Sequence, residues 1–307
     1  MTEPLARPRR LARLVRRKLF WAAVSIPLVI AGICGWLTAP LEPIAPEIPT
    51  TPKFHPVAVA EKPKLPDWPA TALGGRDATE ILLASLRDAN SRLKAAGGYT
   101  AVMHKTERLN GRLGAEQILE MKCRHEPFSI YFKFRTPETG KEVVFSAGHY
   151  DDDVIAHGAG FSRRLIPRLK VPPTSPLAMA GNRHPITDAG LLNLTNRLIG
   201  FRELDLADPE ARTVLDRVKF DTGKEVLRSV HTHPHQKPER PFQLVEVIYD
   251  AETRIPIQIT SFDWPSAGET GDPRLAEKYR YDDLKLGAEL TDADFDPRNP
   301  AYAFSRF

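Results

Sequence analysis

Residues Leu19–Leu37 form one long uncharged run, LFWAAVSIPLVIAGICGWL. A helix of about 20 apolar residues crosses the ~30 Å hydrocarbon core of a bilayer, so this run predicts a transmembrane helix. Residues 1–18 carry seven basic side chains and one acidic side chain, and few basic residues follow the run. By the positive-inside rule, residues 1–18 stay in the cytoplasm and the chain after Leu37 is exported.

A cleaved signal peptide is the alternative interpretation of the same run. Signal peptides have an apolar core of about 7–15 residues followed by a small-x-small cleavage site. The run here is longer, and a cut after Ala39 would place bulky Leu37 at the third position back. A lipoprotein-type cut at Cys34 would have Ile33 where a small residue is required. We favour a retained anchor in the inner membrane and leave cleavage open.

The positive charge of the chain is concentrated before the apolar run. The whole chain has a net charge of +4, and residues 1–18 account for +6 (seven basic minus one acidic), so the remainder carries −2. The basic residues therefore indicate membrane contact and orientation, and no nucleic-acid partner is expected. Cys34 lies inside the predicted transmembrane helix and Cys123 in the exported domain, so the two cannot pair with each other. The exported domain must therefore be stable without a disulfide. Its roughly 230 residues are enough for that.

Prolines mark the boundary between the anchor and the domain. They recur from Pro40 to Pro69, at first every third residue, which is the pitch of a polyproline II helix and indicates a semi-rigid tether. We therefore divide the chain into a basic cytoplasmic tail (1–18), a transmembrane anchor (19–38), a proline-rich linker (39–75) and an exported β-rich domain (76–307).

The exported domain is predicted to begin with a helix. Asp77 and Glu80 have the spacing of a capping box, and Gly97 and Gly98 would end the helix. Between them an apolar stripe recurs at helical spacing, formed by Leu82, Leu86, Ala89 and Leu93. This helix is therefore expected to be a fixed part of the core.

Short strand-like runs separated by turns make up most of the remaining domain. The clearest is FSIYFKFR, which alternates strictly between apolar and other residues, and Asn110-Gly111 is a strong hairpin signal. The predicted strands are Tyr99–Leu109, Leu113–Arg124, Phe128–Arg135, Gly140–Tyr150, Val154–His157, Val214–Asp221, Glu225–His233, Phe242–Asp250, Ile255–Trp264 and Ala276–Leu286.

A helical segment interrupts the strands in mid-chain. An irregular, proline-rich stretch, Ile166–Pro185, leads into an amphipathic helix predicted at Thr187–Ile199, with Gly190 inside it. The whole pattern predicts an α+β fold that is mostly antiparallel β. We expect a curved sheet or half-barrel with an N-terminal helix and a mid-chain lid helix, preceded by one transmembrane helix.

Several blocks of the domain resemble one family. They are RHEPFSIYFKF, SPLAM, NRHPITDAG, YDAETRIPIQITSFDWP, KYRYDDLKLG and TDADFDPRNPAYAF. These blocks are similar to the exported bacterial family catalogued as domain of unknown function fifteen-seventy-one, over most of Asp77–Phe307, and the similarity weakens between Arg202 and Pro241. The resemblance implies no activity, because the family has none established. The layout is also similar to the periplasmic lipoprotein-carrier (LolA/LolB-like) fold, whose apolar concave face holds acyl chains.

No pattern in the sequence assembles a catalytic site. The chain has no Gly-x-Ser-x-Gly, no phosphate-binding Gly-Lys-Ser/Thr loop and no His-Glu-x-x-His. His231, His233 and His235 would share one face of a strand, as metal ligands can. Because Pro234 interrupts this run, we interpret all three as solvated loop histidines. We therefore predict no metal, no cofactor and no catalytic residue.

Other candidate residues are interpreted as structural. His125 and His184 are expected to be buried and bonded to backbone groups. The three aspartates of Asp292–Asp296 lack the glycine and glutamate of a calcium loop, so they are expected to cap a final turn while Phe295 docks inward. Cys123 is expected to be a buried, inert thiol.

The functional prediction depends on two apolar faces, one on a strand and one on the mid-chain helix. Large apolar side chains on a strand must be covered, and the helix is available to cover them. We therefore predict a membrane-anchored, single-span, non-enzymatic envelope protein that binds a lipid, acyl chain or lipoprotein in an apolar groove. An envelope interaction or sensing module with a filled core is the second interpretation, and a hydrolase is the third. The candidate groove residues are Phe128, Ile130, Phe132, Phe134, Leu191, Leu194 and Leu198.

The predicted topology can be tested with a reporter enzyme that is active only in the periplasm. Because the basic residues crowd before Leu19, a reporter fused after Pro69 is expected to be active. The mature protein is also expected to keep its original N-terminus. An N-terminus mapped at Pro40 or beyond would contradict the anchor and favour a cleaved signal.

Overall fold

The computed structural model describes residues 65–160, 168–265 and 272–306. The predicted transmembrane run Leu19–Leu37 lies outside these residues, as do residues 1–18 and most of the linker. Within the described ranges, no helix is both long and apolar enough to cross a membrane. All the described residues belong to one compact unit, Pro43–Phe307.

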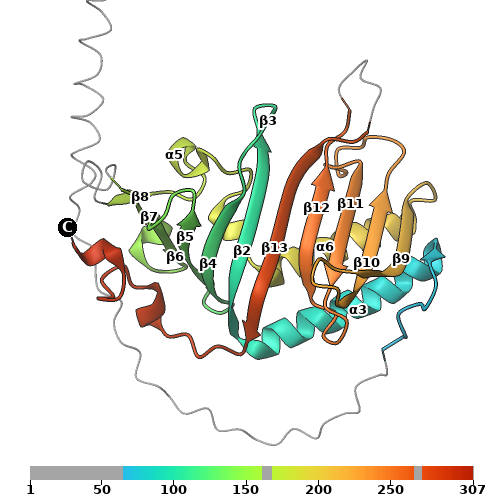
Figure 1. The fold of residues 1–307 in the computed structure, drawn as a ribbon, viewed down its shortest axis with the longest axis horizontal. Coiled ribbons are helices and arrows are strands. Elements are labelled where there is room, and N and C mark those ends of the chain that lie inside the picture. Colours follow the sequence, from blue (N-terminus) through green and yellow to red (C-terminus); the bar gives the residue numbers. More distant parts are fainter. Residues whose placement is uncertain (1–64, 161–167, 266–271, 307) are drawn as a thin grey trace, which may run out of the picture. The chain divides into compact units, whose positions relative to one another are not determined.

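A single antiparallel sheet of thirteen strands runs through this unit (Figure 1). Two meanders, β9 to β13 and β2 to β8, join where β13 pairs with β2, and β1 adds to β9. The strands are β1 (Leu73–Gly74), β2 (Gly98–Leu109), β3 (Arg112–Leu113), β4 (Gln117–Arg124), β5 (Ser129–Thr136), β6 (Glu142–Ser146), β7 (Val154–His157), β8 (Leu169–Val171), β9 (Arg212–Lys219), β10 (Glu225–Thr232), β11 (Leu244–Tyr249), β12 (Pro256–Phe262) and β13 (Leu275–Leu286). The mostly antiparallel, open sheet with few helices therefore agrees with the predicted fold class.

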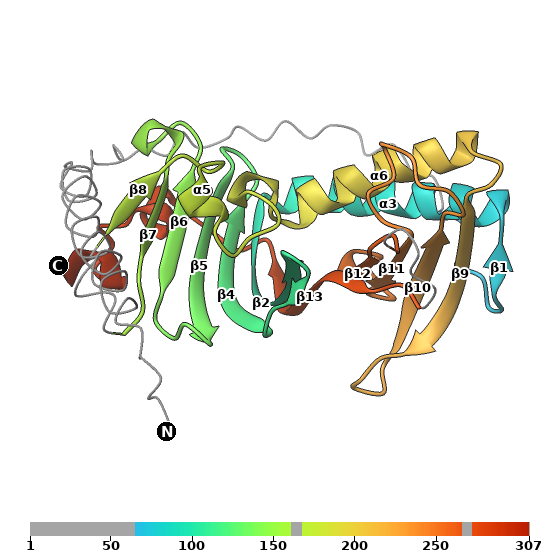
Figure 2. The ribbon, with the colours of Figure 1, turned by 90° about the horizontal axis from the view of Figure 1, so that it is seen from above.

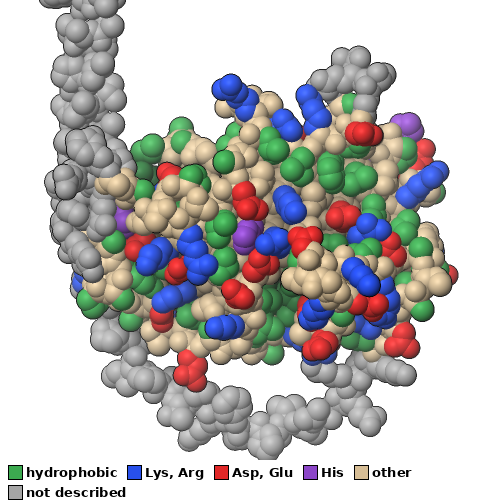
Figure 3. Space-filling model, viewed as in Figure 1, with side chains coloured by type: hydrophobic (Ala, Val, Ile, Leu, Met, Phe, Trp, Pro, Cys, Tyr) green, Lys and Arg blue, Asp and Glu red, His purple; other side chains and the backbone are tan. Residues whose placement is uncertain are grey.

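The two long helices lie side by side along one face of the sheet (Figure 2), which we call the inner face. They are α3 (Arg76–Ala96) and α6 (Leu191–Ala207). The remaining helical pieces are short: α5 (Pro176–Met179) and the 3₁₀ turns η1 (Tyr150–Asp152), η2 (Ile186–Asp188), η3 (Asp292–Phe295) and η4 (Ala303–Arg306). On the opposite, outer face, basic and acidic side chains lie next to one another (Figure 3), including the Arg228–Asp216 ion pair.

Helix α3 packs as its apolar stripe predicts, but its start differs from the prediction. The predicted capping box is wrong, because the N-cap is Gly75 and no side chain caps the helix. Asp77 is already the second helical residue, so it supports the positive end of the helix dipole instead. Gly97 ends the helix as expected, with φ of 70°. The predicted stripe is confirmed as fully buried at Leu82, Leu86, Ala89 and Leu93.

Helix α6 is longer than the amphipathic pattern indicated. The prediction was Thr187–Ile199, whereas the helix begins at Leu191 and ends at Ala207. Gly190 is its N-cap rather than an interior residue. The N–H of Leu191, at the first position of the helix, donates to the Tyr99 hydroxyl at 2.9 Å. The buried stripe continues past Ile199 through polar residues, which hid it from a hydrophobicity pattern. Its members are Leu191, Thr195, Leu198, Arg202 and Asp205.

The strand boundaries mostly agree with the alternation in the sequence. The largest differences are at β4 and β6. The predicted strand from Leu113 is divided into the short β3 and, from Gln117, β4, and the strand predicted at Gly140–Tyr150 is the shorter β6, Glu142–Ser146. The stretch predicted to be irregular, Ile166–Pro185, contains β8 and α5. The final turn is confirmed: Thr291 and Asp294 form a capping box, and Phe295 is fully buried.

The C-terminal segment covers the outer face of β5 to β7. The Tyr302 ring stacks on Tyr131 with centroids 4.1 Å apart, and Phe304 meets the ring of His157 edge-on at 4.7 Å. The Glu142 carboxylate accepts the Ala303 N–H at 2.8 Å. Both faces of β5 are therefore buried, the inner face by the apolar core and the outer face by this segment.

The junction between η2 and α6 gives a test of backbone constraint. Gly190 has φ of 99° and ψ of 152°, and an added Cβ would lie 3.2 Å from the Cys123 Sγ. Side chains other than glycine are almost excluded from that backbone region, at a cost of about 1–3 kcal/mol. Gly190→Ala is therefore expected to lower the free energy of unfolding by at least that amount in urea denaturation.

Gly200 is the matched control for this prediction. It lies inside the same helix with open space around it and no positive φ. Gly200→Ala should raise stability by about 0.5–1 kcal/mol, because alanine is the better helix former. Equal effects of the two substitutions would contradict the assignment of Gly190 as a special backbone position.

Candidate ligand cavity

A cavity of about 680 Å³ lies between the inner face of the sheet and the helical side of the molecule. Strands β2, β4 to β8 and β11 to β13 form one wall, and α6 forms another. The third wall is the segment between β8 and α6, residues 172–190, which we call the covering segment. Its apolar contributors to the lining include Leu177, Ala178, Pro185 and Ile186.

The structure brings four of the seven predicted groove residues into this cavity. Phe132 and Phe134 line it from β5, and Leu194 and Leu198 line it from α6. Ile130 and Leu191 are fully buried in the neighbouring core and do not line the cavity. Phe128 lines a separate pocket of about 240 Å³ beside Cys123 and His125. A role of these residues in ligand binding stays a prediction.

A cluster of charged and polar side chains crosses from the sheet to the covering segment at one part of the cavity. Strands β2 and β13 are paired so that Glu277 lies opposite Glu107 and Tyr279 opposite Lys105, which places all four side chains together on the inner face. The covering segment supplies three residues of the family-like block NRHPITDAG. We call the set the latch: Lys105, Glu107, Glu277, Tyr279, Asn182, Arg183 and His184.

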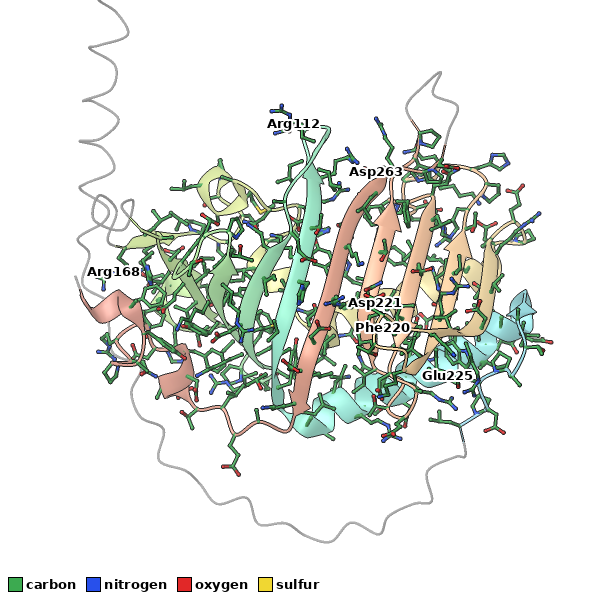
Figure 4. All side chains as sticks on the ribbon, in the orientation of Figure 1. Arg112, Arg168, Phe220, Asp221, Glu225 and Asp263 are labelled. Carbon is green, nitrogen blue, oxygen red and sulfur yellow. The ribbon has the colours of Figure 1, made fainter. Side chains whose placement is uncertain are left out.

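Glu277 is the centre of the latch on the β13 side. Its carboxylate lies 2.8 Å from His184 Nε2 and 3.3 Å from Arg183 Nε. Arg183 also lies 3.5 Å from Asp263, and Figure 4 shows Asp263 toward the same end of the strands as Arg112. The cations of the covering segment therefore hold it against the end of β12 and β13.

Glu107 and Lys105 form the β2 side of the latch. Glu107 accepts the Arg183 N–H at 3.1 Å and the Tyr279 hydroxyl, and Lys105 donates to Asn182. Burial lowers the pKa of Lys105, against the opposing effect of Glu107. Burial together with the two carboxylates raises the pKa of Tyr279, so its hydroxyl stays a donor. Each buried carboxylate thus has several donors, which a buried charge requires.

The histidine predictions are partly wrong. His231 is fully buried and His233 is 5 % exposed, so neither is a solvated loop histidine, whereas His235 is exposed. His231 lies on β10, a strand with neighbours on both sides, and its ring contacts Thr213 and Ser229. His233 lies 3.0 Å from Asp205 of α6. The sequence could not place that carboxylate 28 residues away.

The remaining structural assignments have different outcomes. His184 contacts the Glu277 carboxylate rather than the expected backbone group. His125 is only partly buried and lies against the Tyr99 ring, with centroids 5.8 Å apart. Cys123 is buried as expected, and burial raises the pKa of its thiol to about 12. Within the described residues, no group of three or more His, Cys, Asp or Glu side chains is arranged to hold a metal ion.

The predicted groove residues are all apolar and do not include the latch. Alternation along β2 gives the signal that could have found it. Tyr99, Ala101 and Met103 are buried on the inner face, and Lys105 and Glu107 continue the same period of two. Charged residues at inward positions of a strand indicate a buried polar site.

The fold and the cavity define a class: an α+β protein in which an open antiparallel sheet and a helical side enclose one cavity with a mainly apolar lining. Within this class the chain belongs to the family described as Protein of unknown function (DUF1571), whose model matches residues 96–304. This confirms the family resemblance seen in the sequence blocks. A comparison with curated protein sequences gives no match.

Three solved structures with a similar arrangement are distant from this chain in sequence. The Mycobacterium tuberculosis lipoprotein LppX is 14% identical, with a TM-score of 0.40, and the match covers 71% of this chain and 99% of that one. A LolA superfamily protein from Nitrosomonas europaea is 12% identical, with a TM-score of 0.30, over 69% and 96% of the two chains. A DUF1329 family protein from Desulfovibrio piger is 12% identical, with a TM-score of 0.33, over 70% and 97%. These TM-scores are too low to carry an argument about this chain.

The latch predicts which substitution loosens the covering segment. Glu277→Gln removes the charge shared by Arg183 and His184, and a hydrogen bond to a charged group is worth about 1.5–3 kcal/mol. We expect a loss of that size in the free energy of unfolding, and faster amide hydrogen exchange in residues 182–190. Glu225→Gln is the control, because that carboxylate is exposed and pairs with Arg217 on the surface. Unchanged exchange in Glu277→Gln would contradict the latch.

Proposed function

We propose that this protein is a membrane-anchored component of the cell envelope whose exported domain binds an apolar ligand, such as a lipid or acyl chain, without chemical conversion. The observation that carries the proposal is the cavity of about 680 Å³ with a mainly apolar lining. Its volume falls within the ~300–1,000 Å³ typical of small-molecule sites. The anchor is the run Leu19–Leu37, and the domain is held beyond the membrane by the proline-rich linker.

The free energy of an unfilled cavity supports a ligand. The cavity is partly open to solvent, so its apolar lining stays in contact with water, at a cost of about 25 cal/mol per Å² relative to burial. Water fills apolar cavities poorly, because it finds few hydrogen-bonding partners there. An acyl chain would recover the lost contacts with Leu119, Phe132 and Phe134 on the sheet wall.

The covering segment gives this ligand a route in and out. Residues 172–190 contain only short helical pieces, and the latch holds them by polar contacts rather than by a large apolar interface. Such segments open at lower free energy than a packed helix such as α3. We infer that the covering segment and the start of α6 act as the lid.

An envelope interaction or sensing module is the alternative function. The sequence-based version of this alternative had a groove filled by the protein's own side chains, whereas the inner face holds a cavity of about 680 Å³. An interaction module would therefore need an apolar segment of a protein partner, rather than a lipid, to fill that cavity. Both functions use the same lining, so they differ only in the occupant.

A hydrolase is the third and least supported function. Ser229 and His231 form a hydrogen-bonded pair, but both are fully buried and neither lines the cavity. Ser261 lines the cavity, but its hydroxyl donates to Glu277 and not to a histidine. Neither arrangement presents an accessible nucleophile with its base.

The proposal predicts that blocking the cavity abolishes acyl binding. Val143 lines the cavity from β6, so Val143→Trp should fill space that an acyl chain would use. Val214→Trp is the control, because Val214 is exposed on β9 and does not line the cavity. We expect the full chain to bind hexadecanol in equilibrium binding, Val214→Trp to bind it equally, and Val143→Trp to lose it.

Two further measurements separate the candidate functions. Hexadecanol should slow amide hydrogen exchange in residues 172–194 of the wild-type chain, and lipids retained by it should be identified by mass spectrometry and be absent from Val143→Trp. If hexadecanol does not bind and no retained lipid depends on Val143, the carrier function is excluded and the interaction module is favoured.

A further inference from the structure

A second group of charged side chains lies beneath the C-terminal half of α6, separate from the latch. Arg202 and Asp205 belong to α6, and Arg240 comes from the loop after β10. Arg202 is 2 % exposed and Arg240 is 3 % exposed. Both guanidinium groups contact the same carboxylate: Arg202 Nε lies 2.8 Å from Asp205 Oδ2, and Arg240 Nη2 lies 2.8 Å from Asp205 Oδ1.

In this cluster the cations connected by ion pairs outnumber the carboxylates. Asp208 adds a second carboxylate at 3.9 Å from Arg240 Nη2, but Lys237 already lies 2.7 Å from the same oxygen. Three cations (Arg202, Arg240 and Lys237) therefore meet two carboxylates (Asp205 and Asp208), which leaves an excess of +1. Lys237 is partly exposed, so the surplus falls on the two buried arginines. A buried charge without a counterion is strongly unfavourable.

Arg202 is the arginine that borders the cavity. It contributes to the lining together with Leu198 and Phe201 of the same helix. Its Nη1 makes no hydrogen bond to any described residue, although buried donors are paired almost without exception. Burial lowers the pKa of Arg202 to about 10, with Asp205 opposing and Arg240 reinforcing this shift, so the group remains charged at neutral pH. A cationic donor in an apolar wall is a favourable contact for an anion.

We propose that the ligand of the cavity is an anionic amphiphile, an acyl chain carrying an acid group, and that its carboxylate or phosphate pairs with Arg202. The inference rests on the proposed function, because it requires a ligand in the cavity, and it adds the charge of that ligand and the residue that recognises it. Arg197 also lines the cavity, but its side chain is 41% exposed and lies 4.0 Å from Asp188. Solvent screens that charge, so it discriminates less.

The test compares palmitate with hexadecanol, which have the same chain length and differ in charge. In equilibrium binding to the full chain, palmitate is expected to bind about 10- to 100-fold more tightly, the range for a hydrogen bond to a charged group. Arg202→Gln should remove this preference and leave hexadecanol binding unchanged. Arg197→Gln is the matched control on the same helix and should keep the preference, and Arg202→Lys, which keeps the charge, should keep part of it.

Each outcome bears on a separate claim. Binding of neither ligand to the wild-type chain overturns both the proposed function and this inference. Equal binding of both ligands overturns the inference alone, since a neutral acyl ligand would then suffice. Loss of the preference in Arg197→Gln but not in Arg202→Gln overturns the choice of residue. Lysophosphatidic acid with the same chain tests the head group: tighter binding than palmitate supports a phosphate, and weaker binding supports a carboxylate.

A measurement on the wild-type chain keeps the inference testable if Arg202→Gln does not fold. Palmitate labelled with ¹³C at the carboxyl group reports its own ionisation through its chemical shift. Beside Arg202 the pKa of the bound acid should fall below the ~4–5 of ordinary carboxyl groups, because a nearby cation favours the charged form. A pKa above that range would show an acid buried in apolar surroundings, and would overturn the assignment.

Discussion

The pairing of β13 with β2 is the contact on which the rest of the molecule depends. It joins two meanders that would otherwise be separate sheets, and it links strands about 170 residues apart, as in the pair Glu277 and Glu107. Because the register fixes which side chains share the inner face, it also creates the latch by placing two carboxylates next to each other. Two adjacent buried carboxylates are unfavourable unless cations and donors compensate them. The covering segment supplies those groups through Arg183 and His184, so closure of the cavity follows from the strand pairing.

Because the cavity leaves part of the inner face unpacked, the stability of the fold must come from other, well-packed regions. One source is the α3–β9 half, where Trp68, Leu82 and Tyr249 belong to a second core cluster, whose buried members Leu198 and Ile259 also border the cavity. The other is the outer face of β5 to β7, which the C-terminal segment covers with the Tyr131–Tyr302 stack and the packing of Phe304 on His157. Strand β5 can therefore present Phe132 and Phe134 to a cavity without becoming an unstable edge of the structure. The family match, over residues 96–304, includes Tyr302 and Phe304 of this C-terminal segment.

The sequence predicted most of the elements but only part of the site, for reasons that particular residues make clear. Strict alternation predicted β5 because its apolar residues face the core, although the C-terminal segment also buries its outer face. The stripe from Leu82 to Leu93 predicted α3 because it is the buried face of that helix. Local patterns failed where burial depends on distant partners. His233 is buried because it meets Asp205, and α6 continues past Ile199 because Arg202 and Asp205 carry its buried stripe as polar residues. A filled core and a cavity also present the same apolar face in a sequence, so only the packing distinguishes them.

The two charged clusters that border the cavity differ in their balance of cations and carboxylates, so a charged group of a ligand would interact differently with each. In the latch, Lys105 and Arg183 meet the carboxylates of Glu107 and Glu277, and Arg183 also meets Asp263 outside the latch, so neither cation is left without a carboxylate. In the cluster beneath α6, the arginines outnumber their buried carboxylate. An acid group would therefore be favoured at Arg202 over the latch, and the charges lie in a medium of low dielectric where such differences act strongly. The other charged side chains of the lining include the balanced pairs Arg197 with Asp188 and Lys141 with Glu138. The electrostatics of the cavity would thus orient an amphiphile before any specific fit of its chain contributes.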